Sequence, residues 1–196
     1  MNRRHFVLGI SNFGFIMLSG TTAESSTAGT VFNITWRDLN IGYSKVNITR
    51  NGSQIVARTE VLIKVNILGI DLFDYKLNSK EIWRNKALFS LDSEVFTAGK
   101  REFSSVKRKS QNSFEIFGSG FKGIFSGNPG TTSYFTPHFL ERDVWISTQN
   151  GKPLNVEVKK VGPQNINTPN GTIEAMKWSI TGDLQLNLFY DNNDEW

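Results

Sequence analysis

Cysteine is absent from this chain of 196 residues, and histidine occurs only twice. The lack of cysteine excludes disulfides, thiolate metal ligands and cysteine nucleophiles. Two histidines leave little material for a histidine-based metal centre or for proton transfer. With 20% charged and 38% hydrophobic residues, the composition is that of a globular protein, and the length predicts one domain. Composition alone therefore argues against several classes of enzyme.

Long hydrophobic runs are also missing, because no stretch reaches the roughly 20 apolar residues that a transmembrane helix needs. The main apolar run extends from Val7 to Leu18 and follows a basic start, and small residues ending at Ala23 come after it. This order predicts a secretory signal peptide over residues 1–23 that is cleaved after Ala23. We therefore expect one β-rich domain over residues 24–196, located in the periplasm or secreted, with the export machinery as a partner.

The start of this segment resembles the twin-arginine export motif, since the pair Arg3 and Arg4 is followed by Phe6. The general secretory route is the alternative. Loss of residues 1–23 would remove two of the 22 basic residues and none of the 18 acidic ones, so the net charge would fall from +4 to +2. A mature chain so close to neutral is not expected to bind nucleic acid.

The remaining sequence predicts β-structure almost throughout. Residues 54–68 alternate between two faces, which is typical of a half-buried strand. A strand of this length should twist, curve or bulge. One predicted face carries Ile55, Ala57, Thr59, Val61, Ile63, Val65 and Ile67. Asn51-Gly52 precedes it, and this pair is the strongest short signal for a hairpin.

Short strands and turns then alternate regularly, which favours an antiparallel meander. The other predicted strands are 41–50, 88–96, 101–106, 114–119, 154–161, 173–180 and 184–190. The region 132–146 is the least strand-like and allows a short helix, whereas 162–171, with Pro163 and Pro169, is predicted to be a long loop. We expect an all-β fold: a strongly curved sheet or a partly closed up-and-down barrel, with a two-sheet sandwich as the alternative.

Five segments, in this order, resemble a family of secreted bacterial proteins known as domain of unknown function 6134. They are Phe32-Asn33-Ile34 with Asn40-Ile41-Gly42, Glu81-Ile82-Trp83 with its following turn and Leu88, Asn150-Gly151, Trp178 to Gly182, and Phe189-Tyr190-Asp191. The resemblance implies an exported β-rich domain and no activity. Related chains would continue past Trp196 with a further strand, so we expect this chain to lack its C-terminal strand and to leave 184–190 as an edge.

Few residues are candidates for catalysis, metal binding or cofactor binding. His138 is the one histidine of the expected mature chain and has no recognisable partners for a triad. Glu81 with Asp71 or Asp74 could form a carboxylate pair for glycoside hydrolysis. Asp191, Asp194 and Glu195 supply oxygen ligands of the kind that Ca²⁺ takes, although a polar turn explains them better. Gly118 to Gly123 match a dinucleotide-binding pattern without the helix that it requires.

We therefore predict no catalytic, cofactor-binding or metal-binding residues and no enzyme activity. The 15 Phe, 5 Trp and 4 Tyr either fill a core or line a pocket for a lipid or another apolar ligand. The leading hypothesis is a non-enzymatic periplasmic domain that binds an apolar ligand or an envelope partner. A structural or envelope-interaction protein with a filled core is the alternative, and a hydrolase that uses carboxylates comes last.

Overall fold

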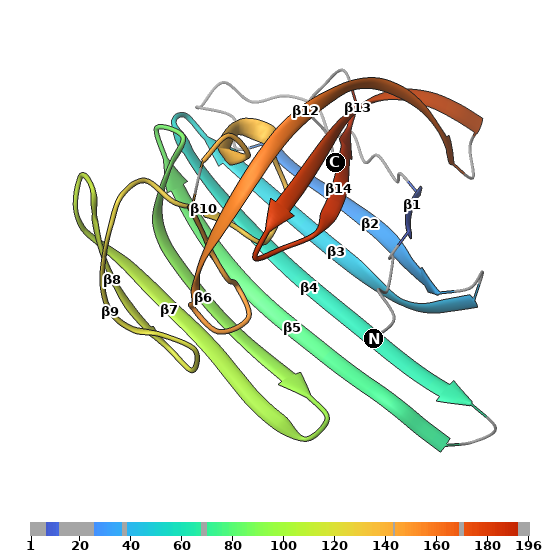
Figure 1. The fold of residues 1–196 in the computed structure, drawn as a ribbon, viewed down its shortest axis with the longest axis horizontal. Coiled ribbons are helices and arrows are strands. Elements are labelled where there is room, and N and C mark those ends of the chain that lie inside the picture. Colours follow the sequence, from blue (N-terminus) through green and yellow to red (C-terminus); the bar gives the residue numbers. More distant parts are fainter. Residues whose placement is uncertain are drawn as a thin grey trace.

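The computed structural model describes residues 7–11, 26–36, 39–67, 70–142, 144–168 and 171–191. This part of the chain folds into two β-sheets (Figure 1). The large sheet contains β1 (Val7–Ser11), β2 (Ser26–Trp36), β3 (Leu39–Asn51), β4 (Gln54–Ile67), β5 (Ile70–Arg84), β6 (Ala87–Thr97), β7 (Lys100–Ser110), β8 (Ser113–Gly118) and β9 (Lys122–Ser126). The second sheet contains β10 (Gly130–Thr131), β11 (Val144–Ile146), β12 (Pro153–Thr168), β13 (Gly171–Gly182) and β14 (Leu186–Tyr190).

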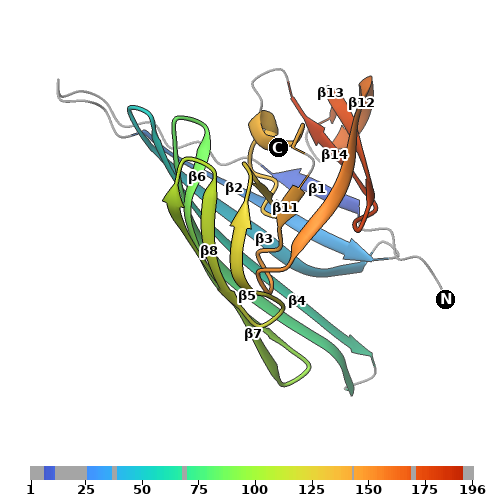
Figure 2. The same ribbon diagram turned by 60° about the vertical axis from the view of Figure 1, so that its left-hand side comes forward.

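The large sheet is an antiparallel meander in which β1 to β9 lie side by side in chain order. The second sheet lies over part of one face of the large sheet, while the far ends of β4, β5 and β7 extend beyond it (Figure 2). The outer strands of the large sheet do not pair with each other in the described part of the chain, so the sheet does not close into a barrel. The prediction of an all-β meander is confirmed, and the two-sheet alternative fits the arrangement.

The predicted signal peptide overlaps the first strand. Residues Val7 to Ser11 form β1, which pairs antiparallel with β2 from Val7 opposite Thr35 to Ser11 opposite Val31. Arg3, Arg4, Phe6 and Ala23 lie outside the described residues, so the export motif and the cleavage position stay predictions.

The alternation along β4 is confirmed. Ala57 and Thr59 are buried on the face that the second sheet covers, whereas Arg58 between them is exposed. The strand is 14 residues long, and its pairing with β5 shifts register between Val65 and Asn66. The bulge relieves the strain of a long twisted strand, as the sequence predicted.

A row of small side chains crosses the covered face of five strands. Directly paired positions place Thr59, Ser79, Ser93, Ser104 and Gly118 side by side on β4 to β8. The turn at 147–151 packs onto this row, where the Ser93 hydroxyl donates to the Thr148 carbonyl and the Gly120 N–H donates to the Asn150 carbonyl at 2.8 Å. Larger side chains in the row would prevent this close approach of two backbones.

Two hairpin turns of the large sheet use left-handed backbone at residues other than glycine. Asn85 and Lys86 have φ of 50° and 61° between β5 and β6, and Ala98 has φ of 48° before Gly99, whose φ is 76°. Two successive positive φ values are the signature of the tight turn that matches the twist of a hairpin. Asn and Gly adopt this conformation readily, whereas alanine adopts it at a cost.

Replacing Ala98 by asparagine is therefore expected to stabilise the protein by about 0.5–1 kcal/mol, because asparagine tolerates the left-handed conformation that alanine resists. Urea denaturation of the two proteins measures the difference. Ser53→Asn is the matched control, since Ser53 is also an exposed turn residue but is not among the residues with positive φ. An equal gain in both variants would show that backbone strain at Ala98 is not the cause.

The prediction of a long loop over 162–171 is wrong. Strand β12 continues through Pro163 to Thr168, and Pro163 pairs with Met176 of β13. Strand β11 pairs only with positions 153–155 of β12, so the rest of β12 has a free edge in the described structure. Proline fits a strand where its missing N–H would face such an edge. The register shift between Lys160 and Gly162 bends the strand at this point.

The predicted non-strand region does contain a short helix. A 3₁₀ turn spans Pro137–Phe139, and the Thr136 hydroxyl accepts a hydrogen bond from the His138 N–H at 3.4 Å. In the described part of the chain, no helix has the length and apolar character needed to cross a membrane.

Aromatic and aliphatic side chains fill the space between the sheets. One buried cluster joins the large sheet to the 3₁₀ turn through Trp83, Phe135 and Phe139, and the other lies under β12 to β14 around Trp145 and Trp178. The rings of Trp83 and Phe139 stack with centroids 4.8 Å apart, and Trp145 meets Phe139 edge to face at 6.3 Å. The aromatic residues of the sequence thus contribute chiefly to a packed core.

Candidate functional site

A buried carboxyl group lies at the centre of this packing. Glu81 projects from β5 toward the second sheet and is 1% exposed. Its Oε2 accepts a hydrogen bond from the indole N–H of Trp83 at 2.8 Å and one from the hydroxyl of Thr131 at 3.0 Å. Thr131 also shares a 2.9 Å hydrogen bond with Ser133. Because Glu81 and Trp83 are two residues apart on a strand, they share one face and can bond to each other.

Burial raises the pKa of the Glu81 carboxyl above its usual value, and the hydrogen-bonding side chains of Ser133, Trp83 and Thr131 only partly oppose this shift. Its Oε1 atom has no well-formed hydrogen bond. The raised pKa favours the neutral carboxylic acid, which avoids the cost of an unpaired charge in an apolar core. Through its hydrogen bond with Thr131, Glu81 connects β10 to the large sheet.

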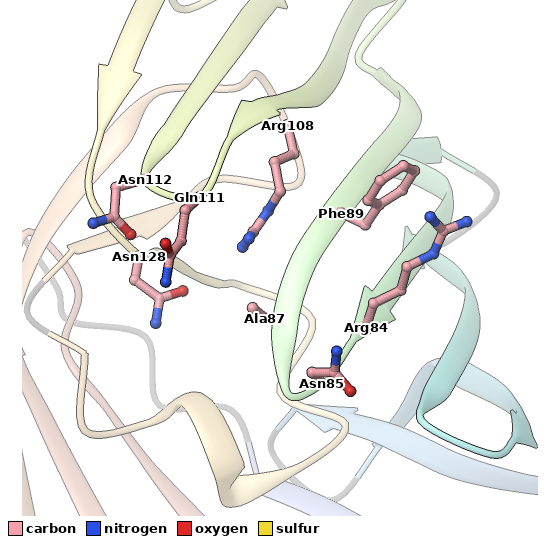
Figure 3. Close-up of a pocket in the computed structure, with 8 residues that line it drawn as sticks. All are labelled: Arg84, Asn85, Ala87, Phe89, Arg108, Gln111, Asn112 and Asn128. Carbon is pink, nitrogen blue, oxygen red and sulfur yellow. The ribbon is translucent and has the colours of Figure 1, made fainter.

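A pocket opens at the end of the large sheet close to this core. It has a volume of about 430 Å³ and lies between the β5–β6 turn, the β7–β8 turn and the loop before β10 (Figure 3). Its lining residues are Arg84, Asn85, Ala87, Phe89, Arg108, Gln111, Asn112 and Asn128. The lining thus combines two guanidinium groups, four side-chain amides and one aromatic ring, with no acidic residue.

Arg108 is the central cation of this pocket. Its side chain extends into the space between Ala87 and Gln111 (Figure 3). Its Nε donates to the Leu88 carbonyl at 2.7 Å, and its guanidinium lies 5.0 Å from the centroid of the Phe114 ring. The Nη2 atom is buried and has no hydrogen-bond partner. A buried guanidinium donor without an acceptor is costly. Because this atom is closed to solvent, an anion in the pocket would reach it only after neighbouring side chains had moved.

Arg84 lies at the opposite side of the pocket from Asn112 and Asn128 (Figure 3). Its guanidinium lies 3.7 Å from the centroid of the Phe89 ring, and its Nε donates to Gln54 at 3.1 Å. Stacking on an aromatic ring orients a guanidinium while leaving its remaining N–H groups free to donate.

A third arginine holds the walls of the pocket together. Arg142 donates to the carbonyl of Pro129 at 2.7 Å and to that of Lys86 at 2.6 Å, so it connects the loop that carries Asn128 to the turn that carries Asn85. Burial, together with the nearby charge of Arg108, lowers the pKa of Arg142. None of Arg84, Arg108 and Arg142 forms an ion pair with a carboxylate of the described residues. Among the described residues, the groups around the pocket are therefore cationic or neutral.

The structure separates the carboxylate pair that the sequence offered for hydrolysis. Glu81 is buried on the covered face of β5, while Asp74 is exposed. Their separation of seven positions, an odd number, places their side chains on opposite faces of the strand. The side chain of Asp71 is outside the described part of the structure. His138 is exposed on the 3₁₀ turn.

The remaining sequence motifs also have a place in the fold. Gly118 to Gly123 extend from the last residue of β8 into β9, so a strand and not a helix follows the first glycines of this pattern. Asp191 is the last described residue, and Asp194 and Glu195 lie beyond it. Among the described residues, no three histidine, cysteine or acidic side chains are grouped as a metal site would require.

The basic run Lys107-Arg108-Lys109 allowed a phosphate-binding patch as a minor interpretation, with a solvated hairpin tip as the favoured one, and did not predict the arginine pocket. Arg84, Arg108 and Asn128 are far apart in the chain, and only the hairpin pairing of β5 to β9 brings them to the same end of the sheet. Arg84 precedes the turn residues Asn85-Lys86, and Arg108 lies close to the turn residues Gln111-Asn112.

The family model described as "Domain of unknown function (DUF6134)" matches residues 32–196. The chain belongs to this family. No curated protein and no solved structure matches the chain. The DUF6134 match includes Glu81, Trp83 and all residues that line the pocket.

Proposed function

We propose that this DUF6134 domain is an exported, non-enzymatic binding domain that recognises a ligand through an anionic group, a carboxylate or a phosphate. The two arginines Arg84 and Arg108, in a pocket whose described lining has no acidic residue, are the observation that carries this proposal. Arginine presents several N–H donors in one plane, which suits the oxygen atoms of both anions. The amides of Asn85, Gln111 and Asn128 supply further polar contacts around the same space.

The proposed binding site differs from the apolar interior that the sequence suggested. Trp83, Phe139 and Trp145 are at most 3% exposed and fill the region between the sheets. A ligand therefore reaches the protein most readily at the rim of the large sheet, where Phe89 offers apolar contact beside the charged group. Export to the periplasm or the exterior rests on the basic and apolar start of the chain with Arg3, Arg4 and Ala23.

The absence of enzyme activity is part of the proposal. The buried carboxyl of Glu81 is occupied by two hydrogen bonds and is shielded from solvent, which suits a structural role better than acid–base catalysis. The pocket itself is lined by groups that bind anions, and none of its side chains is a usual nucleophile or general base.

An envelope-interaction protein with a filled core is the second candidate. The outer face of the large sheet favours it, because Phe96 and Phe117 are 43% and 54% exposed there and Lys122 lies 4.6 Å from the Phe117 ring centroid. Exposed aromatic residues beside cations often mark a surface for a partner. On this alternative, the arginine pocket would bind no anion.

Titration with inorganic phosphate and with acetate, at constant ionic strength, tests the proposed function. We expect a saturable response of the amide signals around the pocket in NMR spectra. Arg108→Gln should weaken binding about tenfold or more, because it removes a charged hydrogen-bond donor. The matched control is Arg101→Gln, which alters an exposed arginine that pairs with Glu94.

Binding that is unchanged in Arg108→Gln, or a response to both anions that never saturates, would contradict the proposal. Circular dichroism shows whether the variant is folded. Because Arg108 also donates to the Leu88 carbonyl, Arg84→Gln gives a second measure of the pocket that leaves this structural hydrogen bond intact.

A further inference from the structure

Strand β9 forms an open edge of the large sheet. It is five residues long, and Lys122, Gly123, Ile124 and Ser126 are exposed. In the described structure β8 is the one strand with which β9 pairs. An edge with exposed main-chain donors and acceptors is a template for another strand unless something blocks it.

The direction of the main-chain groups along β9 follows from two hydrogen bonds. The Gly127 N–H donates to the Asn112 carbonyl, and the Phe121 carbonyl accepts from Gly118, so both groups point toward β8. Main-chain groups alternate along a strand. The N–H and carbonyl groups of Lys122, Ile124 and Ser126 therefore point away from β8, to the open edge.

Two apolar side chains lie on the outer face beside this edge, among the polar residues Lys122, Ser126 and Glu115. Ile124 is 60% exposed, and its diagonal neighbour Phe117 on β8 is 54% exposed. Ile124 is the middle residue of β9, so its side chain marks the centre of the open edge. Lys122 and Phe103 contact the Phe117 ring, yet about half of Phe117 and more than half of Ile124 stay exposed.

We propose that β9 pairs antiparallel with β9 of a second copy of this chain, about a two-fold axis at Ile124. This register places Ile124 opposite its own equivalent and Lys122 opposite the partner's Ser126, so no like charges face each other. It also places Gly123 opposite the partner's Phe125, whose ring can cover the glycine. Roughly six main-chain hydrogen bonds would join the two edges, since three residues of each strand point outward.

The pairing is self-complementary, which a two-fold dimer requires. Phe117 and Ile124 of both copies would form one continuous apolar strip on the outer face of the joined sheets. The arginine pocket opens at the end of the sheet, so the dimer is independent of anion binding.

The lack of cysteine makes a direct test possible, because one introduced cysteine is the single thiol of the chain. In the proposed dimer the two copies of an Ile124→Cys variant would have Cα atoms about 5.5 Å apart, within the range of a disulfide. Mild oxidation should therefore give a covalent dimer as the main product. Glu115→Cys is the matched control, since Glu115 pairs with Ile124 on the same face but lies one strand further from the axis.

Light scattering on the unmodified chain should give twice the mass of one chain, and Ile124→Lys should lower the dimer fraction at least tenfold by placing two ammonium groups opposite each other. Ile124→Val should leave the dimer intact. A monomer at all concentrations would overturn the proposal and would leave β9 available to a strand of a different protein. A dimer that Ile124→Cys does not cross-link, or that Ile124→Lys does not weaken, would also overturn it, since another interface would then be in use.

Discussion

The free energy of unfolding of the original protein is expected to decrease as the pH rises. Replacing Glu81 by glutamine is expected to abolish this decrease. The fold raises the pKa of this carboxyl, so the folded state favours its neutral form more than the unfolded chain does. The contribution of neutral Glu81 to the stability of the folded state is fully present below the ordinary pKa of glutamate. It is lost progressively, by about 1.4 kcal/mol per pH unit, until the pH passes the raised pKa of the folded state.

Glutamine has the shape of neutral glutamic acid and stays uncharged at every pH. Its carbonyl oxygen can still accept from Trp83 and Thr131, and its amide takes the place of Oε1. The free energy of unfolding, measured by urea denaturation from pH 5 to pH 9, should therefore fall for the original protein and stay nearly level for Glu81→Gln, apart from changes common to both.

Glu115→Gln serves as the control for this experiment. Glu115 is exposed, and its hydrogen bond and ion pair with Lys109 lower its pKa, which is the opposite shift. This variant should keep the same decline at high pH as the original protein. A decline that persists in Glu81→Gln would assign the pH dependence to another group.

The strands could be predicted from the sequence because apolar and polar residues alternate along a strand that has one buried face and one exposed face. Residues 54–68 show this alternation, and β4 occupies them almost from end to end. The pair Asn51-Gly52 predicted the hairpin turn between β3 and β4 to within one residue. Asn51 ends β3 and pairs with Gln54, so the turn consists of Gly52, which has a positive φ, and Ser53. The features that depend on two or three neighbouring residues were therefore predictable.

Features that depend on residues far apart in the chain could not be predicted from the sequence. Pro163 indicated a loop, yet it lies in β12, where the short β11 leaves an edge on which proline is tolerated. The sequence offered Glu81 as one acid of a carboxylate pair for hydrolysis. Its burial instead favours the neutral form, which accepts hydrogen bonds. This burial depends on β10 and the 3₁₀ turn. The arginine pocket has the same origin, because its walls come from separate hairpins.

Trp83→Ala is expected to cost about 3–5 kcal/mol of stability, the range for losing a large aromatic side chain from a core. Trp83 is 3% exposed and packs against Phe139 and Phe135. Its truncation also removes a donor to Glu81 and leaves Arg142 without the ring that lies 5.6 Å from its guanidinium. Urea denaturation should show the midpoint falling sharply, and an effect below about 1 kcal/mol would contradict the packing described for this core.

Trp83→Phe separates the hydrogen bond from the packing. Phenylalanine keeps an aromatic ring against Phe139 but cannot donate to Glu81, so a loss of about 1–3 kcal/mol is expected in addition to the smaller ring. In a Glu81→Leu background the acceptor is already gone, and the indole N–H is itself a buried group without a partner. Trp83→Phe should then cost less than it does beside Glu81. Equal costs in the two backgrounds would show that the bond between Glu81 and Trp83 contributes nothing, whereas a coupling of 0.5 kcal/mol or more, roughly the least expected for contacting residues, would show that the pair acts as one unit.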